Sequence, residues 1–148
     1  MTAVPSASIG SSHALGGDYA HALRELAALA RPGGQVLVGE GYWRRPPGDA
    51  YLAALGASAD ELTDYAGLVR AGEQAGLVPW YATVATEEEW DRYEWTLIAN
   101  GERYAAAHPD AREVAAWARA ARERYLAPGG RDTLGFGLFL FARPGPSA

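Results

Sequence analysis

The chain has no cysteine and no lysine among its 148 residues. The absence of cysteine excludes a disulfide scaffold and a thiolate metal site. The three histidines are scattered along the chain, so no metal site is expected. No apolar run approaches the ~20 residues that cross a bilayer, and no apolar segment of a signal peptide follows Met1. We therefore expect a cytoplasmic protein that is not bound to a membrane.

The charge balance also excludes a class of partner. The net charge is −5, whereas nucleic-acid binding depends on clustered basic side chains. A chain of this length that is 49% hydrophobic and 21% charged fits one domain with a sizeable core. We place this domain at residues 1–143, and residues 144–148 are expected to form a disordered tail.

One stretch indicates a helix followed by a buried strand. Asp18 fits a helix N-cap, apolar residues follow at helical spacing, and Pro32-Gly33-Gly34 ends the helix. A short apolar run at 36–38 predicts a parallel strand. Ligands of open α/β sheets bind outside the carboxyl ends of strands, so we expect Glu40, Tyr42 and Trp43 to form a loop where a site would lie.

The rest of the chain alternates between helical and strand patterns. A short strand is expected at 4–9, beginning after Pro5 or lying at a sheet edge. Three further helices are predicted from a capping box at Ser58 and Glu61, a second box at Thr86 and Glu89, and Pro109 in a first turn. A short helix is expected at 51–55, and strands are expected at 77–84 and 134–142.

Several segments resemble class I S-adenosylmethionine-dependent methyltransferases. The segment Ala30-Arg31-Pro32-Gly33-Gly34 is similar to the turn before the family's last parallel strand, and residues 8–17 are similar to its fourth strand and the following loop. The segments 40–43, 90–95 and 130–137 look like signatures of a bacterial small-molecule subgroup. The family's G-x-G-x-G turn, and the acidic residue after it that holds the ribose, have no counterpart here. The chain thus resembles the C-terminal half of such an enzyme.

The resemblance implies an α/β fold that is part of a three-layer, Rossmann-like sheet. The chain would supply strands four to seven with flanking helices, and strands one to three would be absent. The last two strands would form an antiparallel pair at one edge, with the final strand beside the fifth. The strand near Ser6 to Gly10 would lose its neighbour, and such an edge invites pairing. We expect a homodimer, a separate partner that supplies the N-terminal half, or aggregation.

The implied activity is methyl transfer from S-adenosylmethionine to a small molecule. The resemblance assigns Gly10, Ser11 and Ser12 to cofactor binding. His13 could take a proton from the acceptor, or it could only orient its loop by hydrogen bonding. An inactive, truncated binding half is the alternative, and a protein-interaction module built on the Trp-bearing helices is a third possibility.

Six further residues are candidates for the substrate site. They are Glu40, Tyr42, Trp43, Trp90, Glu94 and Arg131. Aromatic faces attract a cationic centre such as a sulfonium, although aromatic residues also cover cores. Glu94 shares the apolar stripe of Trp90, so it either pairs with an arginine, with Arg131 a possible partner, or has a raised pKa. Residues 130–133 read as a turn or as a wall of the active site.

Overall fold

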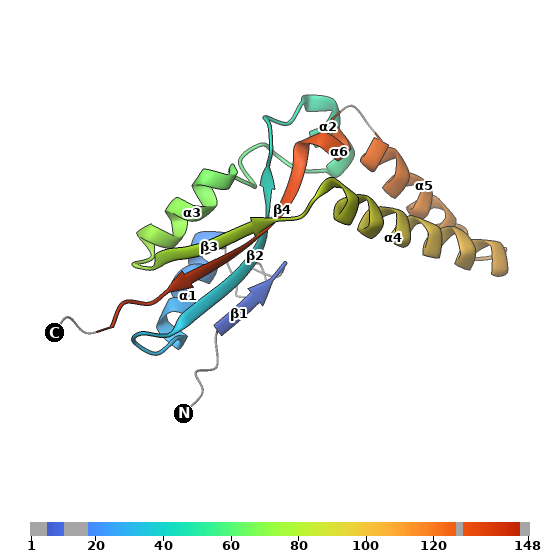
Figure 1. The fold of residues 1–148 in the computed structure, drawn as a ribbon. Helices are drawn as coiled ribbons and strands as arrows, with labels where there is room; N and C mark the ends of the chain where they lie inside the picture. Colours follow the sequence, from blue (N-terminus) through green and yellow to red (C-terminus); the bar gives the residue numbers. More distant parts are fainter. Residues whose placement is uncertain (1–5, 11–17, 127–128, 146–148) are drawn as a thin grey trace. The chain divides into compact units, whose positions relative to one another are not determined.

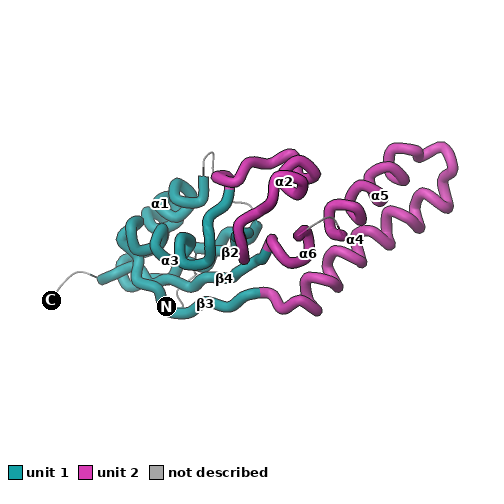
Figure 2. Tube along the Cα trace, turned by 90° about the horizontal axis from the view of Figure 1, so that it is seen from above, with its two compact units in different colours: residues 1–43, 62–84, 135–148 teal, residues 44–61, 85–134 magenta. Residues whose placement is uncertain are grey.

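The computed structural model describes residues 6–10, 18–126 and 129–145. Contacts divide the chain into two compact units (Figure 2). Unit 1 comprises Met1–Trp43, Leu62–Val84 and Gly135–Ala148, and unit 2 comprises Arg44–Glu61 and Ala85–Leu134. The chain leaves unit 1 after Trp43 and again after Val84, and it returns at Leu62 and at Gly135. The single domain at 1–143, followed by a tail at 144–148, stays a prediction.

Unit 1 contains a mixed four-stranded sheet in the order β1-β2-β4-β3 (Figure 1). Its strands are β1 (Ser6–Ile9), β2 (Gln35–Trp43), β3 (Val78–Val84) and β4 (Leu134–Ala142). β1 runs parallel to β2, and β3 runs antiparallel to β4. The backbones of Arg143 and Gly34 are joined by a 2.9 Å hydrogen bond, so the end of β4 lies beside the start of β2. The predicted edge pair and the position of the final strand are confirmed.

The two helices of unit 1 begin at aspartate caps. Asp18 accepts a 2.8 Å hydrogen bond from the His21 N–H and starts α1 (Tyr19–Leu29), as predicted. Asp64 accepts from the Gly67 N–H at 2.6 Å and starts α3 (Tyr65–Gln74). The capping box predicted at Ser58 is wrong as a helix start. Glu61 does accept from the Ser58 N–H, at 2.9 Å, but this bond closes a turn that precedes the helix.

The core of unit 1 lies between these helices and one face of the sheet. α1 contacts α3, and both contact β2. The largest fully buried side chains are Phe139, Phe141, Leu23, Leu68 and Val36. Side chains alternate between the two faces along a strand, so Val36 of β2 and Phe139 and Phe141 of β4 lie on the face that the helices cover. The described part of unit 1 therefore has two layers, a sheet and two helices on one of its faces.

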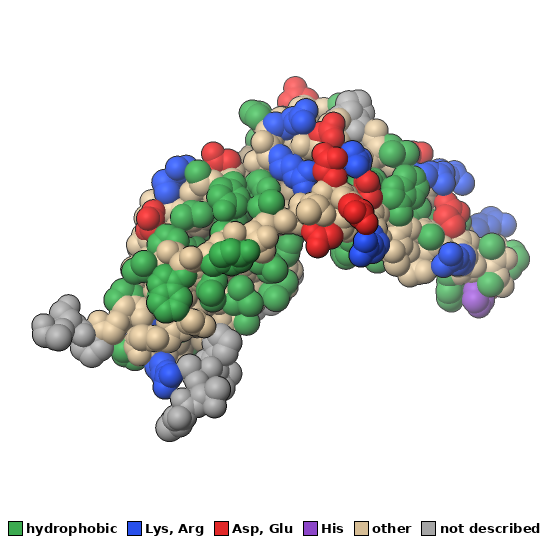
Figure 3. Space-filling view, viewed as in Figure 1, with side chains coloured by type: hydrophobic (Ala, Val, Ile, Leu, Met, Phe, Trp, Pro, Cys, Tyr) green, Lys and Arg blue, Asp and Glu red, His purple; other side chains and the backbone are tan. Residues whose placement is uncertain are grey.

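The opposite face of the sheet carries a different apolar set. A Cβ at Gly39 would lie 2.9 Å from the side chains of Ile9 and Leu138 and 3.0 Å from Phe136, so these three side chains meet on that face. Ile9 is 55% exposed. Figure 3 shows hydrophobic side chains gathered over the strands of unit 1. An apolar sheet face of this kind is a surface that another element can cover.

Unit 2 is helical. Its elements are α2 (Asp49–Leu55), α4 (Glu87–Ala107), α5 (Arg112–Leu126) and α6 (Gly130–Thr133). The predicted capping box of α4 is confirmed, because the Thr86 N–H donates to Glu89 at 2.8 Å and the Glu89 N–H donates to Thr86 Oγ1 at 3.2 Å. Pro109 lies before α5 rather than in its first turn, since the Ala111 N–H bonds to the His108 carbonyl and closes a separate turn. Residues 130–133 form a one-turn helix where the sequence predicted a turn.

Candidate functional site

The carboxyl end of β1 leads into the segment predicted to bind the cofactor. Gly10 has a φ of 61°, a left-handed conformation that favours glycine, and its N–H donates a 2.9 Å hydrogen bond to the Gly39 carbonyl. The backbone can therefore turn away from the sheet immediately after β1. Ser11, Ser12 and His13 lie outside the described residues. Gly10 is thus the predicted cofactor-binding residue whose geometry is known.

Glu40 lies in β2, because this strand continues to Trp43. The predicted loop at 40–43 is wrong, since β2 extends from Gln35 to Trp43 and glycines at 39 and 41 do not interrupt it. Glu40 Oε1 accepts a 3.0 Å hydrogen bond from the Gly41 N–H. Its Oε2 is buried and has no hydrogen-bond partner among the described residues.

Tyr19, the first residue of α1, places a second buried polar group near Glu40. Its hydroxyl also has no hydrogen-bond partner in the part of the chain that the structure describes. Burial, and then the charge of Glu40, raise the pKa of the Tyr19 phenol. Buried polar groups are normally hydrogen-bonded, so this pair is suited to a polar ligand group or a water molecule. Tyr19 was not predicted as a site residue, and the signal for it in the sequence is its place immediately after the helix cap Asp18.

Tyr42 and Trp43 are part of the packing of unit 1. Each is 7% exposed. Tyr42 contacts Tyr65 edge-to-face with ring centroids 5.9 Å apart, and Tyr65 contacts Phe139 at 5.4 Å. The Trp43 N–H donates to the Thr63 carbonyl at 2.9 Å. This environment favours the interpretation that the two aromatic residues cover a core.

Trp90 and Glu94 come together in a cavity of about 90 Å³ within unit 2. Its lining residues come from α2, α4, α5 and the start of β4 and are Tyr51, Leu55, Trp90, Glu94, Ala121, Arg124, Tyr125 and Leu134. Burial raises the pKa of Glu94, and the positive charge of Arg124 offsets part of that effect. Burial, followed by the charge of Glu94, also raises the pKa of Tyr51. The raised pKa that the sequence analysis left open for Glu94 is confirmed in direction.

Arg131 belongs to a different cluster of unit 2. It holds Asp91 by two hydrogen bonds of 2.7 Å, one from Nε and one from Nη2, and it lies 3.5 Å from Glu87. The Tyr125 hydroxyl also donates to Asp91. Hydrogen bonds from Arg131 and then Tyr125 lower the pKa of Asp91 to about 2. The suggested Glu94–Arg131 pair is therefore wrong.

Asp91 was not predicted as a partner of Arg131, although the sequence carries a signal for it. Glu87 and Asp91 are four residues apart in one helix and therefore share a face. Two acids on one face favour a basic partner from elsewhere in the fold, and Arg131 supplies it. Among the described residues, no group of three or more acidic or histidine side chains is placed to hold a metal ion.

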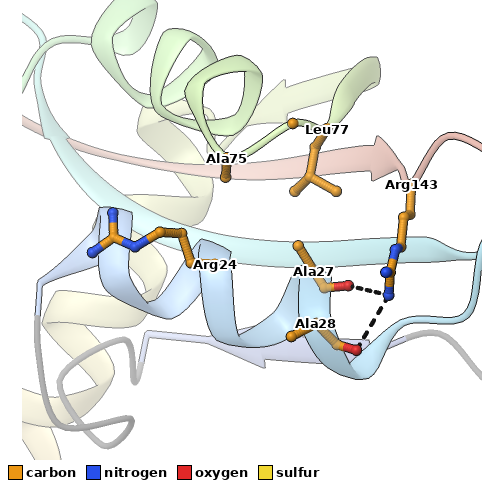
Figure 4. A pocket seen from close by; sticks show the side chains of 7 residues that line it. Arg24, Ala27, Ala28, Ala75, Leu77 and Arg143 are labelled. Atoms are coloured by element: carbon orange, nitrogen blue, oxygen red, sulfur yellow. Dashed lines mark hydrogen bonds between the residues drawn. The ribbon is translucent and has the colours of Figure 1, made fainter.

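A second cavity, of about 310 Å³, lies at the other end of α1 in unit 1 (Figure 4). Arg143 lines it and donates to the carbonyls of Ala27, at 2.8 Å, and Ala28, at 3.2 Å. Arg24 extends away from Arg143 in this view. Because Arg143 satisfies the last carbonyls of α1, its role is that of a helix C-cap. This cavity lies near the start of β2, away from Glu40.

No protein-family model matches the chain. The uncharacterized protein YjhP of Escherichia coli K12 is 36% identical over 136 residues, which are 87% of this chain and 54% of YjhP. Two crystal structures of S-adenosylmethionine-dependent methyltransferases, each in complex with S-adenosyl-L-homocysteine, are 30% identical to the chain. The protein from Geobacter sulfurreducens superposes with a TM-score of 0.82 and that from Thiobacillus denitrificans with 0.81.

The match covers nearly all of this chain but only part of its relatives. It includes 93% of the chain and 56% of each of the two methyltransferases, so the chain spans about half the length of the relatives that it matches. None of the helices that the structure describes has the length and apolar character of a membrane-spanning segment. The mixed sheet and these two superpositions show that the chain has an α/β fold that matches the fold of class I S-adenosylmethionine-dependent methyltransferases.

Proposed function

We propose that this chain acts in methyl transfer from S-adenosylmethionine to a small-molecule acceptor, as the C-terminal half of a methyltransferase domain. The observation that carries the proposal is the superposition on a methyltransferase at a TM-score of 0.82 and 30% identity. S-adenosylmethionine supplies a methyl group on a sulfonium, and its transfer mainly requires alignment with the acceptor. Such transfer needs no metal ion.

The residues of the chain fit only part of a cofactor site. Gly10 provides a left-handed turn, and Glu40 and Tyr19 provide two buried polar groups on unit 1. The sequence contains no G-x-G-x-G turn to approach the cofactor and no acid after such a turn to hold its ribose. We therefore propose that Gly10, Ser11 and Ser12 contribute contacts that are completed by residues outside this sequence.

The proposed roles of the other residues follow from their surroundings. His13 would accept the proton that an O–H or N–H acceptor loses. Glu40 would hold a polar ligand group through its unpartnered oxygen. Trp90 and Glu94 would bind the acceptor in the cavity of unit 2. Arg131 would act through Asp91 and Tyr125 by fixing the helices that line this cavity, while Tyr42 and Trp43 would support β2 from within the core.

We further propose that another polypeptide segment pairs with β1 and covers the apolar face around Gly39. β1 has one neighbour in the described sheet, which leaves its other edge open. The apolar side chains that meet around Gly39, of which Ile9 is 55% exposed, support a partner that supplies both a strand and helices. A separate N-terminal half would pair with the open edge of β1 and cover the apolar sheet face, whereas a second copy of the chain would only pair with the edge.

Reconstitution tests the proposed function. The chain should be co-expressed with the part of YjhP that lies outside the matched region, and formation of S-adenosylhomocysteine from S-adenosylmethionine should be measured with a panel of small amines, alcohols and acids. We expect a stable complex and acceptor-dependent product. His13→Ala should lower turnover about a hundredfold without changing the melting temperature. A stable complex that binds no S-adenosylhomocysteine would contradict the proposal.

A non-catalytic binding module is the second candidate function. Trp80 and Tyr81 on the edge strand β3 are 58% and 65% exposed, and Trp95 and Trp117 of unit 2 are 42% and 45% exposed. Exposed aromatic residues of this kind are enriched at protein interfaces. Under this alternative, the reconstituted complex would bind a small molecule or a protein and produce no S-adenosylhomocysteine.

A further inference from the structure

Glu94 is the unusual acidic residue of α4. This helix carries six acidic residues, and five of them have partners. Glu87 and Asp91 contact Arg131, Glu88 contacts Arg92, Glu89 bonds to Thr86, and Glu102 contacts Arg122. For Glu94, the structure records no hydrogen bond or ion pair with any of the described residues. Glu94 is also half-buried, so its carboxylate has lost part of its hydration without gaining a donor.

Arg124 does not meet this need. It lines the same cavity, and its charge acts on Glu94, yet the two side chains form no ion pair among the described residues. The effect of burial is larger than that of Arg124, because the pKa of Glu94 is raised on balance. The cavity therefore contains a carboxylate that a further hydrogen-bond donor would stabilise.

The other lining residues limit the chemistry of that donor. Three of the eight lining residues, Trp90, Tyr51 and Tyr125, are aromatic, and aromatic faces attract cations. The cavity measures about 90 Å³, and a cavity of ~150 Å³ holds a benzene ring, so there is room for a group of a few heavy atoms. A head group fits this space, whereas a complete metabolite does not.

We propose that this cavity is a subsite for a small primary or secondary organic ammonium group, with Glu94 as the hydrogen-bond acceptor and Trp90 as the aromatic wall. An ammonium with N–H donors forms charge-assisted hydrogen bonds to a carboxylate, which are stronger than those of a neutral group. A quaternary ammonium has no such donor, and Arg124 repels it without compensation. That the bound ammonium belongs to the methyl acceptor rests on the proposed function.

The test compares three ligands of nearly equal size, one cationic, one neutral and one anionic. The 148-residue chain, labelled with 15N, is titrated with ethanolamine hydrochloride, with ethylene glycol and with sodium acetate at pH 7.5 and constant ionic strength, and the indole N–H signal of Trp90 is followed by NMR. We expect a saturable shift with ethanolamine and none with ethylene glycol or acetate. Glu94→Gln should weaken ethanolamine binding at least about tenfold, because the charge-assisted bonds are lost. Trp90→Leu should also weaken it.

Glu88→Gln is the matched control. Glu88 lies on the same helix, its side chain is 84% exposed, and it pairs with Arg92, so its replacement should leave ethanolamine binding unchanged. An equal response to ethylene glycol, a response to acetate instead of ethanolamine, or unweakened binding by folded Glu94→Gln would each overturn the proposal. If the chain binds ethanolamine but the reconstituted complex forms no S-adenosylhomocysteine, the ammonium subsite is supported and the proposed methyl transfer is contradicted. If the complex transfers methyl groups but the chain does not bind ethanolamine, the methyl transfer is supported and the subsite is contradicted.

Discussion

Replacement of Leu23 by alanine tests the packing of α1 against the sheet. Leu23 is 0% exposed and belongs to the core cluster with Val36, Leu68 and Phe139. Leu29 is 74% exposed on the same helix. Truncating a buried leucine costs about 2–5 kcal/mol, because apolar burial is lost and a cavity remains. Truncating an exposed leucine changes stability by at most about 0.5 kcal/mol. Both variants replace a leucine of α1 by alanine, so the change in helix propensity cancels when their stabilities are compared.

Thermal unfolding and urea unfolding, both followed by circular dichroism, measure the Tm and the free energy of unfolding of both variants against the wild type. At this length about 1 kcal/mol corresponds to roughly 2–4 °C in Tm, so Leu23→Ala should lower the Tm by roughly 4–20 °C. Leu29→Ala should stay within about 2 °C of the wild type. Equal losses in the two variants, or a loss below about 0.5 kcal/mol for Leu23→Ala, would refute the orientation of α1 and with it the position of Tyr19 at the candidate site.

Two predictions concern pH. Asp91 has a folded-state pKa of about 2 and an unfolded value of ~3.9, so its contribution to stability is present above ~3.9 and is lost as the pH falls toward 2. The difference between the wild type and Asp91→Asn in urea midpoint should therefore shrink between about pH 4 and pH 2, and a constant difference would contradict the Arg131 bonds. Glu94 has a raised pKa, so it destabilises the fold as the pH rises above its unfolded value of ~4.3. Glu94→Gln should gain Tm relative to the wild type between pH 4 and pH 8, and no gain would argue that the carboxylate is fully solvated.

Local sequence signals predicted the elements of the fold well where one side chain decides the outcome. Asp18 and the Thr86–Glu89 box fixed the starts of α1 and α4 because capping depends on neighbours in the sequence. The box at Ser58 failed because the Glu61 N–H bonds to the Ser58 backbone carbonyl, which closes a turn, while the Ser58 hydroxyl donates to Asp60. The extent of β2 also could not be predicted, since β1 pairs with β2 only as far as Gly39 and the continuation to Trp43 depends on the neighbouring β4 and on a bridge between Trp43 and Asp64. That pairing is a tertiary contact.

The candidate site was predictable only in part. The helical spacing of Trp90 and Glu94 put them on one face, and the structure places both in one cavity. The partner of Arg131 was assigned to the wrong acid, because Asp91 and Glu94 are three residues apart and a sequence does not show which of them a residue 40 positions away will reach. The polar pair of Tyr19 and Glu40 depends on how α1 packs across β2, and periodicity carries no information on that contact.

Isothermal titration of the isolated chain with S-adenosylhomocysteine tests the central claim most directly. If this sequence is the C-terminal half of a methyltransferase domain, most hydrogen bonds to the cofactor come from residues that it lacks. The few contacts at Gly10 and its neighbours should then give a Kd no tighter than about 100 µM. The complex reconstituted with the unmatched part of YjhP should bind at least about tenfold more tightly. Low-micromolar binding by the isolated chain would contradict this account.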